Sequence, residues 1–280
     1  MAKFYFFGNT TNVQMFGSAI ISQNKSIIID GGTPYESDRD QLASFIKEKC
    51  NGVVDAWFFT HAHHDHLGAF CEICKAYPEI KIKKIYMNFP SLDLLKTYGS
   101  REEWEHEFWE NAFDLLFGKH ASILTRVNVG DKFTFDEVTI TVLRTLNNEF
   151  TFDFVNNSCT VYRIDGKDKS VLILGDLAEL GGEEMKNNCD LALMQTDYTQ
   201  MAHHGQRGVN KAFYDHIKPK RCIWPCPDWL WDNDKGLWES GVPSGKGTGP
   251  WWTLDTRKWM DELGVIEHFV EKDGTQSFDI

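Results

Sequence analysis

Four side chains of the kinds that bind metal ions lie within six consecutive residues. They are His61, His63, Asp65 and His66, in the run His-Ala-His-His-Asp-His. Imidazole nitrogens and carboxylate oxygens are preferred ligands of Zn²⁺ and of related divalent ions. The spacing allows His61 and His63 to face one ion while Asp65 and His66 reach a second. We therefore predict a metal site here, in preference to a solvated histidine-rich loop.

Apolar segments precede this run and two later polar stretches. Residues 53–59 are mostly apolar and predict a buried strand that fixes the position of the loop after it. Gly175-Asp176 follows the apolar residues 171–174, and His203-His204-Gly205 comes after residues 190–194, which also read as a strand. Polar residues of ligand type thus follow strands in both halves of the chain.

Strand-like and helix-like patterns alternate along the rest of the sequence, which favours an α/β or α+β architecture. Helices are expected from Ser37 to Asn51, over residues 91–122 and over 179–186. Further strands are expected at residues 3–7, 18–21, 26–29, 132–135, 138–143, 160–164 and 170–174.

Composition limits the classes of function. A chain of 280 residues with 42% hydrophobic residues can form a large core. It has no apolar run long enough to cross a membrane and no signal-peptide pattern at Met1, which predicts a cytoplasmic protein with no membrane association. Seven cysteines suit reduced thiols, and the Cys71 and Cys74 pair is interpreted as packing. A net charge of −12 argues against binding nucleic acid and favours a small-molecule substrate.

Seven of the ten tryptophans lie in residues 224–259, among prolines and glycines. Tryptophan this dense is costly to leave in water, so the segment is expected to be an ordered excursion packed on the main domain. Two interpretations remain open and compatible: a satellite core, or a wall of a substrate pocket with aromatic faces for a base, sugar or acyl group.

In their order along residues 3–225, the H-x-H-x-D-H, G-D and H-H-G motifs resemble those of the metallo-β-lactamase superfamily. Within the superfamily, Asn156-Asn157-Ser158 ahead of a strand, followed by G-D and then H-H-G, is most similar to the hydrolase domain of competence-type DNA-uptake proteins and their soluble relatives. The resemblance implies a four-layer αββα sandwich with the metals at one edge between the two sheets. We expect residues 1–280 to form one such domain.

The resemblance also implies roles for individual residues. His61 and His63 would bind the first metal, Asp65 and His66 the second, and Asp176 would bridge both. His203 is favoured as the last ligand of the second metal, with His204 facing the substrate as a proton donor and Asp65 orienting a water. Many relatives carry a further histidine before the strand at 160–164, but residues 151–158 contain none, so Asp153, Asn156, Asn157 or a water must replace it.

The implied activity is hydrolysis by hydroxide formed on two divalent ions, since a catalytic Zn²⁺ lowers the pKa of its water to about 7. Zinc is expected, with manganese or iron as alternatives. We predict a phosphodiesterase acting on a small phosphodiester or nucleotide-like ester. The alternatives are a thioester or lactam hydrolase, then di-iron oxidoreduction, and, from a different class, a non-catalytic metal-binding sensor that retains the fold.

Overall fold

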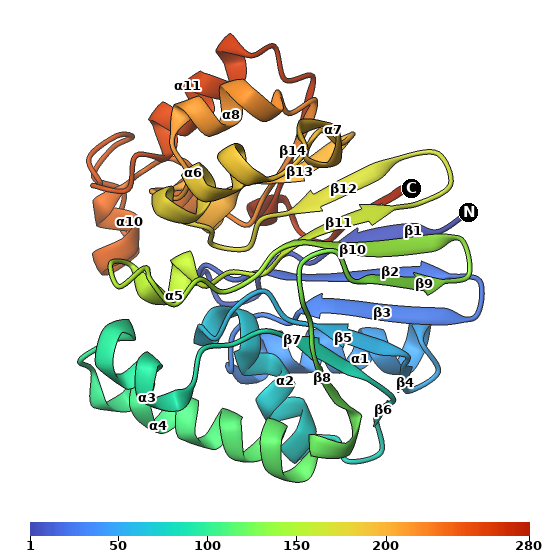
Figure 1. The fold of residues 1–280 in the computed structure, drawn as a ribbon. Coiled ribbons are helices and arrows are strands. Elements are labelled where there is room, and N and C mark those ends of the chain that lie inside the picture. Colours follow the sequence, from blue (N-terminus) through green and yellow to red (C-terminus); the bar gives the residue numbers. More distant parts are fainter.

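The computed structural model covers residues 1–280 and contains two seven-stranded sheets that lie face to face (Figure 1). The first sheet contains, in spatial order, β16 (Gln276–Asp279), β1 (Lys3–Phe6), β2 (Gly17–Ser22), β3 (Lys25–Asp30), β5 (Ala56–Phe58), β7 (Ile85–Met87) and β8 (Leu124–Arg126). The second contains β15 (Glu267–Val270), β14 (Arg221–Trp224), β13 (Tyr198–Gln200), β12 (Ser170–Ile173), β11 (Val161–Asp165), β10 (Val138–Arg144) and β9 (Lys132–Phe135). A separate short pair joins β4 (Val53–Val54) and β6 (Lys81–Ile82).

Helices cover the outer face of each sheet, which gives four layers and confirms the predicted αββα sandwich (Figure 1). On the first sheet lie α1 (Glu36–Lys49), α2 (His64–Ala76), α3 (Leu92–Leu94) and α4 (Glu103–Phe113), with π-helical turns at Leu95–Gly99 and Asp114–Lys119. On the second lie α6 (Glu179–Asn188), α7 (Leu191–Met194), α8 (Lys211–Ile217), α9 (Asp228–Trp231), α10 (Lys235–Ser240) and α11 (Thr253–Glu262). The short helix α5 (Phe154–Asn157) precedes β11, and 3₁₀ turns occupy Ala121–Ile123, Ala202–Gly205 and Glu271–Asp273.

The central strands are buried on both faces because successive side chains point to opposite sides of a strand. In β3, Ile27 and Ile29 pack into the core between the sheets, whereas Ile28 packs under the helices. In β5, Phe58 faces the other sheet and Trp57 faces α2. This double burial explains why residues 53–59 read as a nearly continuous apolar run.

The chain begins and ends in the first sheet. Strand β16 pairs antiparallel with β1, and the Ile280 N–H donates to the Ala2 carbonyl at 3.0 Å. β15, just before it, extends the second sheet beside β14. No helix has both the length and the apolar character needed to cross a lipid bilayer.

The strand expected at residues 190–194 is wrong, because Leu191–Met194 forms the helix α7. The Asp190 carboxylate accepts a hydrogen bond from the Ala192 N–H at 2.9 Å, as an N-cap residue does. Leucine, alanine and methionine after it are good helix formers. The strand that precedes the histidine pair is instead β13, Tyr198–Gln200.

Candidate metal centre

The side chains with metal-binding chemistry gather where parallel strands of both sheets end. Strands β3, β5 and β7 are parallel in the first sheet, and β12, β13 and β14 in the second. Carboxyl ends of parallel strands are common ligand sites in α/β folds. Asp30 ends β3, the loop after β5 carries His61 and His63, Asp176 follows β12, and His204 follows β13.

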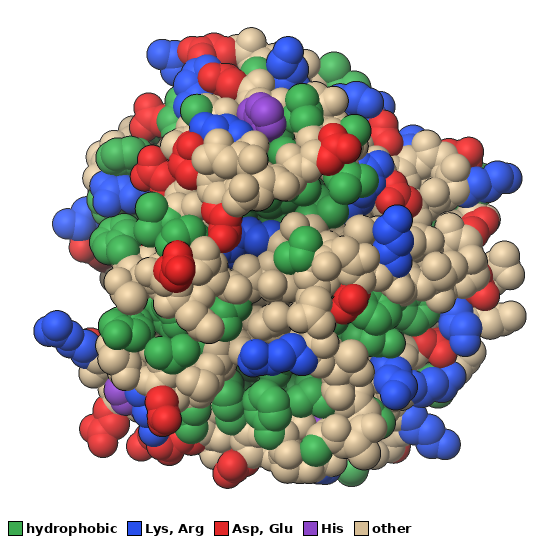
Figure 2. Space-filling view, in the orientation of Figure 1, with side chains coloured by type: hydrophobic (Ala, Val, Ile, Leu, Met, Phe, Trp, Pro, Cys, Tyr) green, Lys and Arg blue, Asp and Glu red, His purple; other side chains and the backbone are tan.

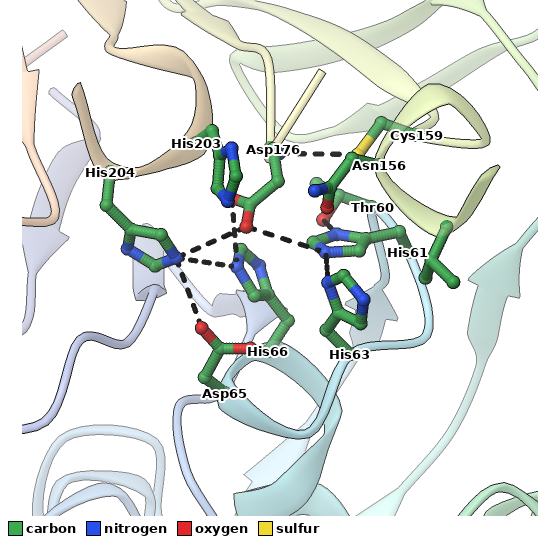
Figure 3. Close-up of polar contacts among 12 residues, drawn as sticks. Thr60, His61, His63, Asp65, His66, Asn156, Cys159, Asp176, His203 and His204 are labelled. Atoms are coloured by element: carbon green, nitrogen blue, oxygen red, sulfur yellow. Dashed lines mark hydrogen bonds and ion pairs between the residues drawn. The ribbon is translucent and has the colours of Figure 1, made fainter. Parts of the chain in front are cut away.

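The loop after β5 is held firmly. The Trp109 indole N–H donates to the Ala62 carbonyl at 2.9 Å, and the Tyr162 hydroxyl donates to the Phe59 carbonyl at 2.8 Å. Helix α2 then begins at His64, so Asp65 and His66 lie in its first turn. Figure 3 shows these side chains pointing toward Asp176 from the other half of the molecule.

His61, His63 and Asp176 form the first group of candidate ligands. His61 Nε2 lies 3.0 Å from His63 Nδ1 and 3.7 Å from Asp176 Oδ2. His61 and Asp176 are fully enclosed, and His63 is partly accessible. We call these residues the first group.

Asp65, His66, Asp176 and His204 form the second group, and all of them are buried. His204 Nε2 lies 3.2 Å from Asp65 Oδ2, 3.3 Å from Asp176 Oδ2 and 3.4 Å from His66 Nε2. His66 Nε2 lies 3.1 Å from Asp176 Oδ1 (Figure 3). Asp176 therefore belongs to both groups, as a bridging carboxylate would.

The structure places His204, and not His203, in the second group, contrary to the sequence-based preference. Both residues have left-handed backbone, with φ of 51° and 57°, so their side chains leave the chain in different directions. His203 Nδ1 is instead 2.6 Å from the Arg207 carbonyl oxygen, which fixes its ring beside Asp176 (Figure 3). Two consecutive non-glycine residues in this conformation cost free energy, which the surrounding contacts must offset.

Opposite protonation patterns distinguish the two groups before any metal binds. Burial lowers the pKa of His63 to about 4, and burial likewise holds the pKa of His61 well below its usual range. Burial would also lower the pKa of His204, but Asp176 and Asp65 outweigh it and raise that pKa to about 10. Burial would raise the pKa of Asp176, yet the charges of His204 and His66 hold it well below the usual range.

The donor arrangement fits metal ions better than a hydrogen-bond network. In each group two imidazole nitrogens face each other at 3.0 Å or 3.4 Å, where only one proton can lie between them. A positive ion between such nitrogens and a carboxylate satisfies all of them at once. The groups could therefore hold one ion each, with Asp176 shared.

The family model of the beta-lactamase superfamily domain matches residues 27–223. The chain belongs to the beta-lactamase superfamily. A comparison with curated protein sequences finds no match.

Solved structures share this superfamily fold over the whole chain. The metallo-β-lactamase fold protein YhfI from Bacillus subtilis is 14% identical, with 100% of both chains covered and a TM-score of 0.56. A diphosphatase of the PhnP family is 12% identical, with 100% and 98% covered and a TM-score of 0.51. CmlA, a diiron β-hydroxylase from Streptomyces venezuelae, is 8% identical, with 100% of this chain and 54% of its own covered and a TM-score of 0.56.

Sequence reasoning missed Asp30 as a supporting residue of this superfamily site. Asp30 Oδ2 lies 2.7 Å from His66 Nδ1 and accepts a hydrogen bond from Thr60 Oγ1 at 2.6 Å. Thr60 Oγ1 is in turn 3.0 Å from His61 Nδ1. A carboxylate that orients a ligating imidazole in this way strengthens metal binding. Its position at the end of an apolar strand was the available signal.

Among the residues expected to replace the absent histidine, Asn156 has the free ligand atom. Asn157 Oδ1 accepts from the Gly181 N–H at 2.8 Å, and its amide nitrogen donates to the Phe152 carbonyl at 2.9 Å. Asn156 donates to Asp153 Oδ1 at 3.0 Å, but its own Oδ1 is buried with no hydrogen-bond partner. Figure 3 shows Asn156 beside His61 and Asp176.

Proposed function

We propose that the protein is a hydrolase that uses two divalent metal ions, most simply zinc, to cleave a small phosphodiester or nucleotide-like ester. The observation that carries this proposal is the shared position of Asp176 between two groups of imidazole and carboxylate ligands. When bound, such a pair of ions lowers the pKa of coordinated water and polarises the oxygen of the substrate.

The residues of the chain divide the remaining work. His61, His63 and Asp176 would hold one ion, and Asp65, His66, Asp176 and His204 would hold the other. Asn156 Oδ1 is assigned as the further ligand of the first group, because it is 4% exposed and otherwise unpartnered. Asp65, at the edge of the second group, is assigned the orientation of the attacking water.

His203 takes the role of proton donor that the sequence suggested for His204. The Arg207 carbonyl holds its Nδ1 at 2.6 Å, so Nδ1 carries a proton and Nε2 is the nitrogen available to a substrate. In the imidazolium form, Nε2 can protonate a leaving alkoxide. His204 cannot do so while both its nitrogens are engaged, Nδ1 by the Pro225 carbonyl at 2.7 Å and Nε2 by the second group.

The charge and the fold support a small phosphate ester. The net charge is −12, and acidic and basic side chains are interspersed over the face drawn in Figure 2, which disfavours a long polyanion. The solved diphosphatase of the PhnP family has the same fold, and the competence-type resemblance also points to phosphodiester chemistry.

The decisive experiment combines metal analysis with a substrate panel of phosphodiesters, phosphomonoesters, thioesters and lactams. We expect chelator-sensitive turnover of bis(p-nitrophenyl) phosphate, and Asp176→Asn should lose at least about 100-fold in activity together with bound metal. Asp93→Asn, at an exposed carboxylate in α3, is the matched control and should match the parent. Asp176→Asn that hydrolyses the phosphodiester as fast as the parent would refute the proposal. If the protein hydrolyses only thioesters or lactams, it is an acyl hydrolase and not a phosphodiesterase. If it binds metal but hydrolyses no ester, it is the metal-binding sensor.

A further inference from the structure

A cavity of about 380 Å³ adjoins the candidate metal centre. Its apolar wall includes Phe152, Trp252 and Trp259, and its polar wall includes Asp153, Glu179 and Arg207. The two tryptophans come from the tryptophan-rich segment, residues 224–259. Other tryptophans of that segment, such as Trp224 and Trp229, are buried in the core under the second sheet. The segment thus contributes to the core under the second sheet, and not to a separate core, and it also forms part of the cavity wall.

Hydrogen-bonded side chains link the wall of the cavity to the candidate metal centre at two points. Asp153 lines the cavity and accepts a hydrogen bond from Asn156 at 3.0 Å, and Asn156 lies beside the first group. Gln206 also lines the cavity and donates to Gln14 at 3.1 Å. Gln14 then donates to Asp65 of the second group at 3.4 Å. One side chain, Asn156, therefore lies between Asp153 and the first group, and Gln14 lies between Gln206 and Asp65 of the second.

Trp252 is presented to this cavity in an unusual way. Its backbone has φ of +66°, which is strained for a bulky side chain, at the N-cap of α11. Trp252 is 52% exposed, although exposing indole to water is unfavourable. The Arg207 guanidinium lies over the ring, 4.4 Å from its centroid, and fixes its orientation. The uncovered part of the indole is an aromatic surface ready for stacking.

The polar side chains of the cavity indicate which substituents the stacked ring should carry. Glu179 Oε1 accepts from Asn210 at 3.1 Å and Asp153 Oδ1 from Asn156, but the second oxygen of each carboxylate has no hydrogen-bond partner in the structure. Free carboxylate oxygens accept N–H donors. Arg207 supplies positive charge for an anionic substituent at the same wall. A planar ring with amino groups and an attached phosphate matches all these features.

We propose that this cavity binds an amino-bearing heteroaromatic ring, such as a purine or cytosine base, and places the attached phosphate ester at the two metal groups. The ring stacks on Trp252, its amino group faces Asp153 or Glu179, and Arg207 contacts the anionic part. The inference rests on the proposed function, since it names the substrate class for that same centre. A nucleotide-type phosphodiester is then preferred over one that lacks a base.

The test measures binding of adenosine 5′-monophosphate and of ribose 5-phosphate to the metal-loaded protein by calorimetry. The two probes share sugar and phosphate, so their ratio isolates the ring. Stacking of a base on an aromatic side chain corresponds to about 5- to 100-fold in affinity, and we expect the parent to prefer the nucleotide by that factor. Trp252→Ala should reduce the ratio to about 1, while Trp252→Phe should keep most of it.

Trp238→Ala is the matched control, because Trp238 is similarly exposed but packs against Trp229 and does not line the cavity. It should leave the ratio unchanged, and melting temperatures verify that each variant is folded. Equal affinity of the parent for both probes, or an unchanged ratio in Trp252→Ala, overturns the inference. Ring-dependent binding without turnover of any ester keeps the cavity assignment but refutes the hydrolase. Turnover of phosphodiesters without a preference for the ring supports the hydrolase but refutes the assignment of the cavity.

Discussion

The two ligand groups differ in how completely the protein builds them. The second group has four charged or ionisable side chains, and both of its histidines have the outer nitrogen fixed at 2.7 Å, His66 by Asp30 and His204 by the Pro225 carbonyl. The first group has three, and His63 is partly accessible. Burial keeps both histidines of the first group uncharged, because it lowers their pKa. His204 of the second group is instead cationic until a metal replaces its proton. This difference indicates what should set metal affinity: the number of ligands in a group and the hydrogen bonds that hold them in place. How closely ligand-type residues follow one another in the sequence should matter less. We expect the second group to hold its ion more tightly.

The largest effect should come from the adjacent histidines. His204→Ala removes a direct ligand, and we expect at least about 100-fold weaker binding of the second ion, more than loss of a supporting residue causes. His203→Ala should retain both ions and instead lower kcat by about 10²- to 10⁴-fold, as loss of a proton donor does. Metal analysis and steady-state kinetics on both variants test this. Loss of an ion in His203→Ala, with full metal content in His204→Ala, would restore the sequence-based assignment.

Removing the carboxylate of Asp30, which orients His66, should have an intermediate effect on metal binding. Asp30→Asn keeps the shape but weakens the acceptor for His66, so the second ion should bind about 10- to 100-fold more weakly. Thr60→Val, which removes the hydroxyl 3.0 Å from His61 Nδ1, should affect mainly the first ion and by less. Competition against a chromogenic chelator resolves the two affinities. An Asp30→Asn protein whose second ion binds as in the parent contradicts the greater support that we assign to this group.

Taken per pH unit, the smallest effect is the pH dependence of stability in the metal-free protein. The pKa of His204 is raised to about 10 in the folded state, against about 6.5 for an unfolded histidine. Its stabilisation is therefore complete below about pH 6.5 and is lost as the pH rises to about 10. The free energy of unfolding should fall over this window by at most about 1.4 kcal/mol per pH unit.

Urea unfolding of the chelator-treated parent and of His204→Ala across this window provides the measurement. The variant should show the weaker dependence on pH, since it lacks the imidazole that releases its proton. Equal slopes in the two proteins would show that His204 is not cationic in the folded state.

The sequence predicted most of the fold because strand and helix periodicity is set by local burial. The apolar run at 53–59 predicted a strand buried between layers. The polar residues that follow the strands predicted the edge where the ligands meet. The strand at 190–194 was wrong because a single capping carboxylate, Asp190, changed the local structure.

The site was predicted less completely, since its remaining features depend on backbone direction and on contacts distant in sequence. No spacing rule distinguishes His203 from His204, because two left-handed residues decide which ring turns inward. Asp30 and Arg207 act through partners that lie 36 and 45 positions away, respectively His66 and Trp252. Only the folded chain brings such pairs together.

Because Asp176 belongs to both ligand groups, metal binding should also affect the thermal stability of the protein. His61, His63, Asp65 and His66 belong to the half built on the first sheet, whereas Asp176 and His204 follow strands of the second. An ion held by either group would cross-link the two halves, and a ligand that binds only the folded state adds about 2.7 kcal/mol at 100 times its dissociation constant. Thermal tolerance of the protein should therefore follow the free metal concentration of its surroundings.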